Sequence, residues 1–299
     1  MTINFLRTPD ERFANLAGFP FKPHYLEDLS GFPGLRLHYL DEAGSSGETW
    51  LCLHGQPTWS YLYRRMIPVL TGAGHRVVAP DFFGFGRSDK PVDEAAYSFD
   101  FHRQTLIEFI QRLDLNNITL VCQDWGGILG LTLPMEMPKR FKRLLVMNTI
   151  LTAGDAPLTA GFIAWRDWSA KNPDMAIGKL MSRSCKHLTP EECAAYDAPF
   201  PDARYKAGVR RFPQLVPDHL DAPGAEISRR AVDWWTEKWA GQTFMAVGMQ
   251  DPVLSPMVMR VLRSVIRDCP EPLELAEAGH FVQEWGEPIA RAALKHFKA

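Results

Sequence analysis

The fold is decided by one stretch of the sequence, Asn117-Ile118-Thr119-Leu120-Val121-Cys122-Gln123-Asp124-Trp125-Gly126-Gly127-Ile128-Leu129-Gly130. Residues 118–122 form an apolar run that is too short for a helix. A glycine-rich turn follows and opens directly into a helical pattern of apolar residues. The stretch therefore predicts a strand, a sharp turn and a helix.

A turn of this kind lifts the residue between two small residues out of the backbone. Here Cys122 and Gly126 are the small residues, and Asp124 is the residue that is raised. The main-chain N–H of the next residue, Trp125, would point at charge that develops beside it. A carboxylate is ionised near neutral pH, so it can attack an alkyl carbon without a base and leave an ester that water must open. The same stretch is also compatible with a solvated aspartate in an ordinary strand-to-helix turn. The rest of the chain must distinguish this possibility from a nucleophile.

Length and composition favour one α/β domain with an insertion. The chain has 299 residues, of which 46% are hydrophobic and 23% are charged, as in an ordinary globular protein. The net charge is −2, and no run is dense in lysine or arginine. These values argue against nucleic acid or an anionic membrane as the main partner.

The cysteines indicate a reducing compartment. There are five of them, an odd number, widely spread and without a C-x-x-C pair. We expect reduced, mostly buried thiols and neither a disulfide framework nor a metal site. The first ten residues lack the apolar segment of a secretory signal, and no run of about 18 apolar residues occurs. The expected location is the cytoplasm.

Strands and helices alternate from Trp50 to Met147, which predicts a mostly parallel sheet with helices on both faces. The expected buried strands span residues 50–53, 76–79, 118–122, 143–147, 243–248 and 273–276. We expect helices over residues 61–70 and 106–113, and a last helix with Ile289, Ala293 and Phe297 on one side. Residues 35–40 alternate as in an edge hairpin. In such sheets ligands bind at the carboxyl ends of the strands, where Asp124 lies.

The strand ending at Leu53 runs into His54-Gly55-Gln56-Pro57. A tight loop there can direct backbone N–H groups into the cavity that receives Asp124. We assign the Gln56 N–H, with that of Trp125, to an oxyanion hole, and expect the Gln56 side-chain amide to contact water or the leaving group. His54 is expected only to satisfy backbone groups. The two glycines of the loop over residues 80–91 do not meet the spacing of a nucleotide site.

The composition and pattern of the sequence change between about residues 151 and 223, where prolines are frequent and no strand-like run appears. Helical fragments over residues 162–169, 175–185 and 190–196 predict a helical cap inserted between strands. We therefore divide the chain into a first core part (1–152), a cap (153–222) and a second core part (223–299).

Two further candidate catalytic residues, Asp251 and His280, each follow an expected strand. Asp251 comes after the strand 243–248, and His280 follows the next strand in a Gly-His-Phe loop. Nucleophile, acid and histidine is the chain order of an α/β-hydrolase triad. A buried acid fixes the imidazole tautomer, while the other ring nitrogen takes a proton from water. Asn148 occupies the rival position for the acid after the preceding strand, and an amide cannot take that charge.

Together these motifs resemble the haloalkane dehalogenases of the α/β-hydrolase fold, in the subgroup whose acid follows the later strand. The likeness covers nearly the whole chain and rests on residues 54–59, 123–127, 251 and 279–281, with the cap segments 161–165 and 207–213. It implies hydrolysis of small haloalkanes by water to alcohol, halide and proton, without a metal or organic cofactor. Its implied roles are Asp124 as nucleophile, His280 as base, Asp251 as its partner, and Trp125 and Trp165 as halide-binding indoles. Relatives often carry Glu where this chain has Gln56, so the polar contribution of that side chain can differ.

The resemblance also implies an apolar substrate pocket, formed by Phe162, Phe212, Val253, Leu254 and Phe281. Trp168, one turn after Trp165, is a competing halide donor. An epoxide hydrolase would share the Asp-Trp turn and the acid–histidine pair but would need two cap tyrosines, for which Tyr196 and Tyr205 are candidates. A ligand receptor with an unused triad is a third possibility, disfavoured because a buried ion pair without a function costs desolvation free energy. A monomer is expected.

Overall fold

The computed structural model describes residues 3–298 and is built on an eight-stranded sheet. The strand order is β10-β9-β8-β7-β4-β5-β3-β2. The strands are β2 (His24–Leu26), β3 (Leu37–Glu42), β4 (Thr49–Leu53), β5 (Arg76–Pro80), β7 (Ile118–Cys122), β8 (Phe141–Met147), β9 (Gln242–Gly248) and β10 (Leu273–Leu275). Neighbours from β10 to β5 are parallel, whereas β3 is antiparallel to β5 and to the edge strand β2. The predicted mostly parallel α/β sheet is confirmed.

Strand β7, which ends two residues before Asp124, lies in the middle of the sheet. It pairs with β4 on one side and with β8 on the other. Every residue of β7 is buried. A strand covered on both faces needs an apolar run and not an alternating pattern, which is what residues 118–122 provide.

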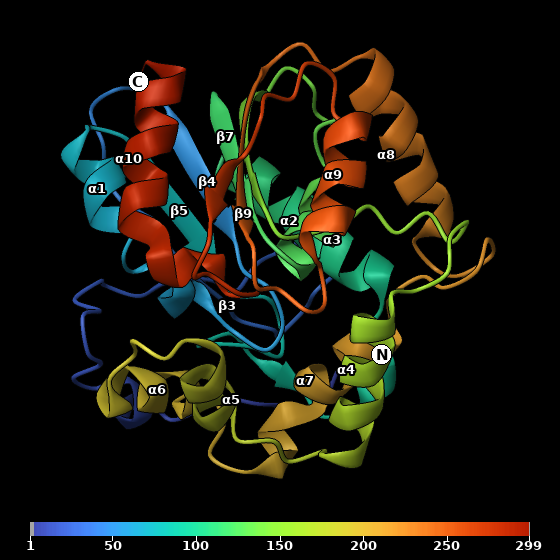
Figure 1. Ribbon diagram of the computed structural model, residues 1–299. Helices are drawn as coiled ribbons and strands as arrows, with labels where there is room; N and C mark the ends of the chain where they lie inside the picture. Colours follow the sequence, from blue (N-terminus) through green and yellow to red (C-terminus); the bar gives the residue numbers. More distant parts are fainter. Residues whose placement is uncertain (1–2, 299) are drawn as a thin grey trace.

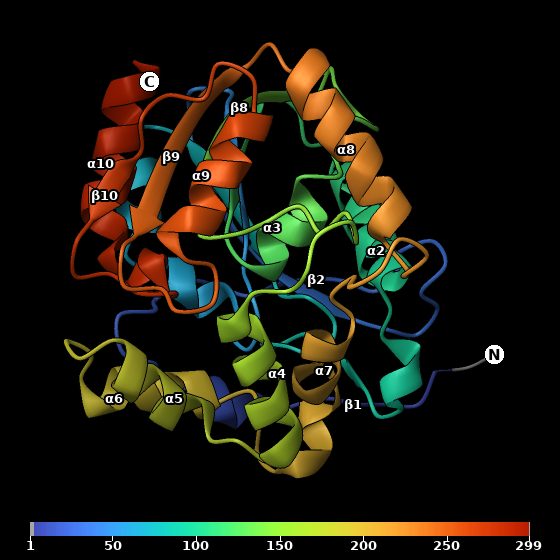
Figure 2. The ribbon, with the colours of Figure 1, turned by 45° about the vertical axis from the view of Figure 1, so that its right-hand side comes forward.

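Helices cover both faces of the sheet (Figures 1 and 2). One face carries α1 (Ile67–Gly72) and α10 (Gly286–Phe297), and the other carries α2 (Phe99–Arg112), α3 (Trp125–Gly130), α8 (Ala225–Glu237) and α9 (Pro256–Val265). On α10 the predicted apolar side is buried, including Ile289, Ala293 and Phe297.

One predicted helix is divided in the structure. Instead of a continuous helix over residues 61–70, a 3-10 turn (Ser60–Tyr63) precedes α1, which begins at Ile67. Pro68 explains the division, because proline has no N–H to donate and is favoured in the first turn of a helix.

Between β8 and β9 the described chain contains helices and no strand. Apart from α8, which covers the sheet, they are α4 (Ala160–Lys171), α5 (Ile177–Ser184), α6 (Pro190–Asp197) and α7 (Ala207–Arg211), with short 3-10 turns at Ala203–Lys206 and Phe212–Gln214. Both ribbon views show them together beyond the end at which the β9 arrow points (Figures 1 and 2). The two-stranded pair β1 (Phe5–Leu6) and β6 (Lys90–Pro91) lies outside the main sheet. Short 3-10 turns also occur at Asp10–Phe13, Glu94–Ala96 and Val282–Trp285.

The structure bears on the expected state of the cysteines and on membrane-spanning helices. All five cysteines are unpaired thiols, four of them buried, as expected from their spacing. None of the helices over residues 3–298 has the length and apolar character needed to cross a bilayer.

Candidate active site

Asp124 occupies a strained turn between β7 and α3. Its backbone has φ 49° and ψ −127°, a conformation that side-chain-bearing residues rarely adopt and that costs about 1–3 kcal/mol. The turn is held by the Asp124 N–H, which donates to the Asn148 carbonyl at 2.9 Å, and by the Thr149 hydroxyl, which donates to the Asp124 carbonyl at 2.7 Å. A Cβ on Gly126 would lie 2.0 Å from the Leu53 carbonyl oxygen, so this position requires glycine. The predicted sharp turn is therefore present, with its backbone fixed by β4 and β8.

The loop after β4 meets the carboxylate of Asp124. The Gln56 main-chain N–H donates to Asp124 Oδ1 at 2.7 Å. A Cβ on Gly55 would lie 2.4 Å from the same oxygen, so only glycine lets this loop approach so closely. One carboxylate oxygen is thus held by a backbone donor, while the other, Oδ2, faces His280.

His280 lies between two carboxylates. Its Nδ1 is 2.9 Å from Asp251 Oδ2, and its Nε2 is 3.6 Å from Asp124 Oδ2. Burial lowers the pKa of this imidazole, but the negative charges of Asp251 and Asp124 outweigh burial and raise the pKa to about 10. The structure therefore brings together the three residues that chain order singled out, and His280 lies between Asp124 and Asp251 in space.

Asp251 is buried and its oxygens are well supplied with donors. Oδ1 accepts from the Val253 and Leu254 N–H groups at 2.8 and 3.0 Å, and Oδ2 accepts from the Asn148 amide at 3.1 Å as well as facing His280. Burial raises the pKa of this carboxyl, but His280 and the two N–H groups outweigh burial and hold the pKa below its usual range. Asp251 is consequently a fixed negative charge beside the imidazole.

Asp124 and His280 line a cavity of about 370 Å³. Its walls come from the loops after β4, β7, β9 and β10 and from α4 and α5. The lining residues are Gln56, Pro57, Asp124, Trp125, Phe162, Trp165, Leu180, Arg183, Ser184, Pro213, Gln250, Pro252, Val253, Gly279, His280 and Phe281. No three His, Cys, Asp or Glu side chains of residues 3–298 are grouped as ligands for a metal ion.

Trp125 and Trp165 both line this cavity. Two other indoles are bonded to backbone carbonyls: Trp59 Nε1 donates to the Ala195 carbonyl, and Trp235 Nε1 donates to the Leu131 carbonyl. Trp168, the competing donor, stacks on Trp165 with ring centroids 5.5 Å apart but is 37% exposed and does not line the cavity. The geometry thus offers Trp125 and Trp165 as the pair of indoles at the site.

Three of the expected contacts differ in the structure. Phe212 does not line the cavity, because it lies behind Trp125, with ring centroids 4.8 Å apart, and is fully buried against Phe85. Leu254 lines a smaller neighbouring cavity of about 90 Å³, which Asp124 and Trp125 also touch. The Gln56 side-chain amide, expected to contact water or the leaving group, donates through Nε2 to the Val209 carbonyl of α7 at 3.0 Å.

The two candidate tyrosines of an epoxide hydrolase lie away from the cavity. Tyr196 is fully buried and its hydroxyl donates to the Glu284 carboxylate. Tyr205 packs against the hydrophobic core and does not line the cavity. His54 is buried with both ring nitrogens engaged, at Gly55 O and at the Phe82 N–H, as a backbone-satisfying residue would be.

Sequence reasoning missed the polar residues that hold the triad. Asn148 was considered only as a rejected acid, yet its side chain bridges Asp251, the Gly248 backbone and the Leu254 carbonyl. The sequence pattern assigns no role to Gln123, although its amide contacts His280. Their positions beside the carboxyl ends of β8 and β7 were the available signal.

Comparison with known proteins supports the same family. The chain matches the family model described as alpha/beta hydrolase fold over residues 50–287. It is 45% identical to a haloalkane dehalogenase of Psychrobacter cryohalolentis, over 98% of each chain, and 40% identical to one of Mycolicibacterium paratuberculosis, over 94% of each. Among solved structures, the tetrameric haloalkane dehalogenase DpaA from Paraglaciecola agarilytica NO2 superimposes with a TM-score of 0.96 at 51% identity, over 98% of each chain.

Proposed function

The chain belongs to the haloalkane dehalogenases, hydrolases that act on carbon–halogen bonds, and from that premise we propose how its own residues carry out the reaction. Asp124 Oδ2 attacks the halogen-bearing carbon from the side opposite the halogen, so that the C–O bond forms as the carbon–halogen bond breaks. Water then opens the resulting ester and releases the alcohol. The observation that carries this proposal is the line Asp251–His280–Asp124 beside a cavity that Trp125 and Trp165 also line.

In the first step a halide leaves with growing negative charge. The indole N–H groups of Trp125 and Trp165 are proposed to receive it, because neither is committed to a backbone carbonyl as Trp59 and Trp235 are. In a cavity that excludes water, such donors stabilise charge more than they would in bulk solvent. Phe162, Val253 and Phe281 supply the apolar wall for the alkyl chain.

In the second step His280 is proposed to act as the base. A water O–H bond breaks, its proton passes to His280 Nε2, and its oxygen bonds to the carboxyl carbon of Asp124. Oδ1 of the ester then becomes an oxyanion that already faces the Gln56 N–H, with the Trp125 N–H as second donor. When the carbonyl forms again, the bond between the carboxyl carbon and Oδ2 breaks, and the leaving oxygen takes the second proton of the attacking water, so that the alcohol departs and Asp124 is again a carboxylate. Esterification removes the negative charge of Asp124, which lowers the pKa of His280 and makes the imidazole available as a base only after the first step.

Residues 153–222 are proposed to act as a cap over this chemistry. Helices α4 and α5 within this range contribute Trp165, Phe162 and Leu180 to the cavity wall. A cap that encloses the cavity would keep water out while the halide leaves. Substrate preference would then depend on these helices and not on the sheet.

Incubation of the pure protein with 1-bromobutane, 1,2-dibromoethane and styrene oxide tests the reaction class. Free halide and diol are measured separately. We expect halide from both bromoalkanes and no diol from the epoxide, because Tyr196 and Tyr205 lie away from the cavity. Diol formation without halide release would contradict the assignment.

Two variants separate the steps. Asp124→Ala is expected to abolish halide release, since it removes the nucleophile. His280→Phe is expected to release about one halide per protein and then stop, with the alkyl group visible as added mass on Asp124 in intact-protein mass spectrometry. Normal turnover of the His280 variant would end the two-step scheme.

Oligomeric state and location stay predictions. The sequence predicts a monomer of 33.8 kDa, while the P. agarilytica relative is tetrameric, so light scattering of the pure chain should distinguish that mass from four times that mass. A cytoplasmic location is proposed because the five cysteines are unpaired.

A further inference from the structure

Gln123 is fully buried directly before the nucleophile and takes no part in the steps above. Its side-chain Nε2 lies 2.9 Å from the carbonyl oxygen of His280 and 3.1 Å from the ring Nε2 of the same residue. The amide therefore contacts the one nitrogen that must accept a proton from water.

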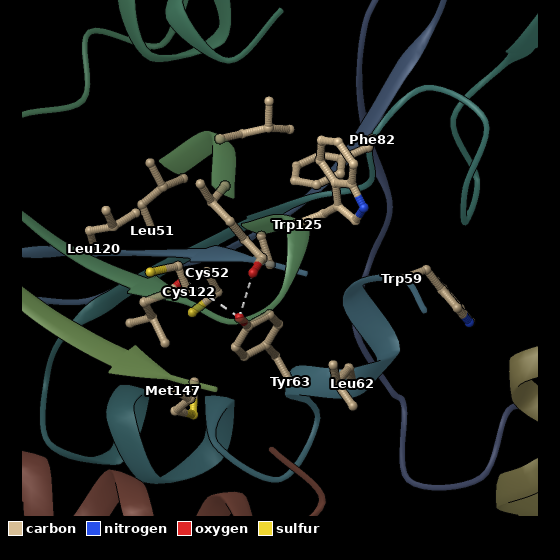
Figure 3. Packing of buried hydrophobic residues seen from close by; sticks show 14 of the residues in the cluster. Leu51, Cys52, Trp59, Leu62, Tyr63, Phe82, Leu120, Cys122, Trp125 and Met147 are labelled. Carbon is tan, nitrogen blue, oxygen red and sulfur yellow. Dashed lines mark hydrogen bonds between the residues drawn. The ribbon is translucent and has the colours of Figure 1, made fainter. Parts of the chain in front are cut away.

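A chain of hydrogen bonds fixes which end of the Gln123 amide faces His280. The Tyr63 hydroxyl donates to the Leu53 carbonyl at 2.7 Å, one of the dashed lines in Figure 3, so its lone pairs are left to accept from Gln283 Nε2 at 3.4 Å. The same Gln283 nitrogen donates to Gln123 Oε1 at 3.3 Å. Because Oε1 is used as an acceptor there, the NH₂ group of Gln123 faces His280.

An N–H directed at His280 Nε2 requires a lone pair on that nitrogen. The ring proton then lies on Nδ1, which faces Asp251 at 2.9 Å. This tautomer is the one that can take a proton from water.

The charged groups around the imidazole raise the pKa of His280, whereas the Gln123 N–H lowers it by favouring the neutral ring. Asp251 and Asp124 both favour the imidazolium, and Arg183 is the remaining charged residue that lines the same cavity. We propose that Gln123 is a positioning residue, which favours neutral His280 with Nε2 unprotonated once Asp124 has become an ester and no longer carries its negative charge. This inference rests on the proposed ester hydrolysis.

The same contact affects the end of the step. When the water O–H bond breaks and its proton binds Nε2, the Gln123 N–H faces a second N–H and the imidazolium is destabilised. The proton is therefore released to solvent more readily, which returns His280 to its neutral form. Gln123 thus favours the base both before and after it acts.

The test is the pH dependence of ester hydrolysis in single turnovers, followed by loss of the alkyl group from the protein. Gln123→Leu removes the donor, so the midpoint of the rising limb should move up by about 0.5 to 1 pH unit. Gln123→Glu, nearly isosteric, replaces the donor by an acceptor and should move the midpoint further. At a pH below the midpoint, Gln123→Leu should lose about three- to tenfold in rate, and the loss should disappear at high pH. Gln104→Leu, at an exposed glutamine bonded to Glu108, is the control and should keep the wild-type midpoint.

A merely structural Gln123 would lower the rate or the melting temperature of the variants but leave the midpoint where it is, and that result would overturn the proposal. Titration of His280 by NMR of the ¹⁵N-labelled protein is an independent readout that needs no substrate. An unchanged His280 pKa in Gln123→Leu would overturn the proposal even if the enzyme turns over haloalkanes. Conversely, a wild-type protein that releases no halide would contradict the proposed function while leaving the NMR test valid. If Gln123→Leu does not fold, the Gln123→Glu variant provides both measurements.

Discussion

At the scale of single residues, the two tryptophans of α4 show how little separates a residue that lines the cavity from a residue on the surface. Trp165 and Trp168 lie one turn apart and stack on each other, but only Trp165 lines the cavity. Spacing alone cannot distinguish them, because both belong to one side of the helix. The orientation of α4 over the sheet makes the distinction.

Trp165→Phe removes one N–H donor and keeps most of the apolar wall. Loss of a donor to developing charge typically costs about 3 kcal/mol, so halide release should slow by about 100-fold. Trp168→Phe is the matched control and should stay within a few-fold of the wild type. Stopped-flow measurement of halide release checks both, and equal losses in the two variants would mean that stacking, not donation, matters.

At the scale of elements, the turn between β7 and α3 is specified by its neighbours. Gly126 faces the Leu53 carbonyl of β4, and Thr149 after β8 bonds the Asp124 carbonyl. The strained backbone of Asp124 persists because both flanking strands hold it.

Gly126→Ala should destabilise the protein by about 3 kcal/mol or more, because its Cβ would lie 2.0 Å from a backbone oxygen that cannot move without the sheet. Gly72→Ala is the matched control: a Cβ there meets nothing within 4 Å, and the residue ends α1. Chemical denaturation should show the Gly72 variant within about 0.5 kcal/mol of the wild type. Similar stabilities of the two variants would contradict the packing argument.

The segment 153–222 is tied to the sheet domain through a buried ion cluster. Arg64 bonds both Glu284 oxygens at 2.7 and 2.8 Å and also bonds Glu192 of α6 at 2.9 Å. The Glu284 side chain is fully buried, and Arg65 is its second cationic partner at 3.1 Å. The cluster therefore joins α6 to the loop that follows His280.

Arg64→Met should cost about 3 kcal/mol of unfolding free energy, since it leaves Glu284 buried with a weaker partner. Arg112→Met, which breaks the exposed pair with Asp28, should change stability very little. Urea denaturation of the two variants compares the sites. A small effect at Arg64 would show that Arg65 alone neutralises Glu284.

At the scale of the whole molecule, buried neutral histidines couple stability to pH. His102 is buried among aromatic rings, including Phe212 at 4.6 Å, and neither ring nitrogen has a hydrogen-bond partner among residues 3–298. Burial lowers the pKa of His102 to about 3. The folded protein thus keeps His102 neutral where the unfolded chain would bind a proton.

The free energy of unfolding should therefore fall as pH drops from about 6.5 toward 3, because the unfolded state binds more protons there. His102 alone contributes a slope of up to about 1.4 kcal/mol per pH unit. His102→Phe should remove that part of the slope, whereas His24→Gln, at an exposed histidine, should keep it. Denaturation curves between pH 4 and 7 measure the slopes, and an unchanged slope in His102→Phe would contradict the assignment.

The sequence by itself determined the class of fold and singled out three residues, Asp124, Asp251 and His280, that the structure brings together. Apolar runs specify strands buried on both faces, a glycine-rich bend specifies the elbow, and strand ends of a parallel sheet meet at one edge, so Asp124, Asp251 and His280 were predictable from local pattern and chain order. Only the tertiary structure decided which side chains face the cavity. Phe212 is behind Trp125, the Gln56 amide bonds the Val209 carbonyl, and Gln123 and Asn148 hold the triad. The first two contacts join α7 and the turn after it to the loops of the sheet, and the other two join loops at the carboxyl ends of β7, β8, β9 and β10. All of them join residues distant in sequence, and no periodicity within one segment encodes them.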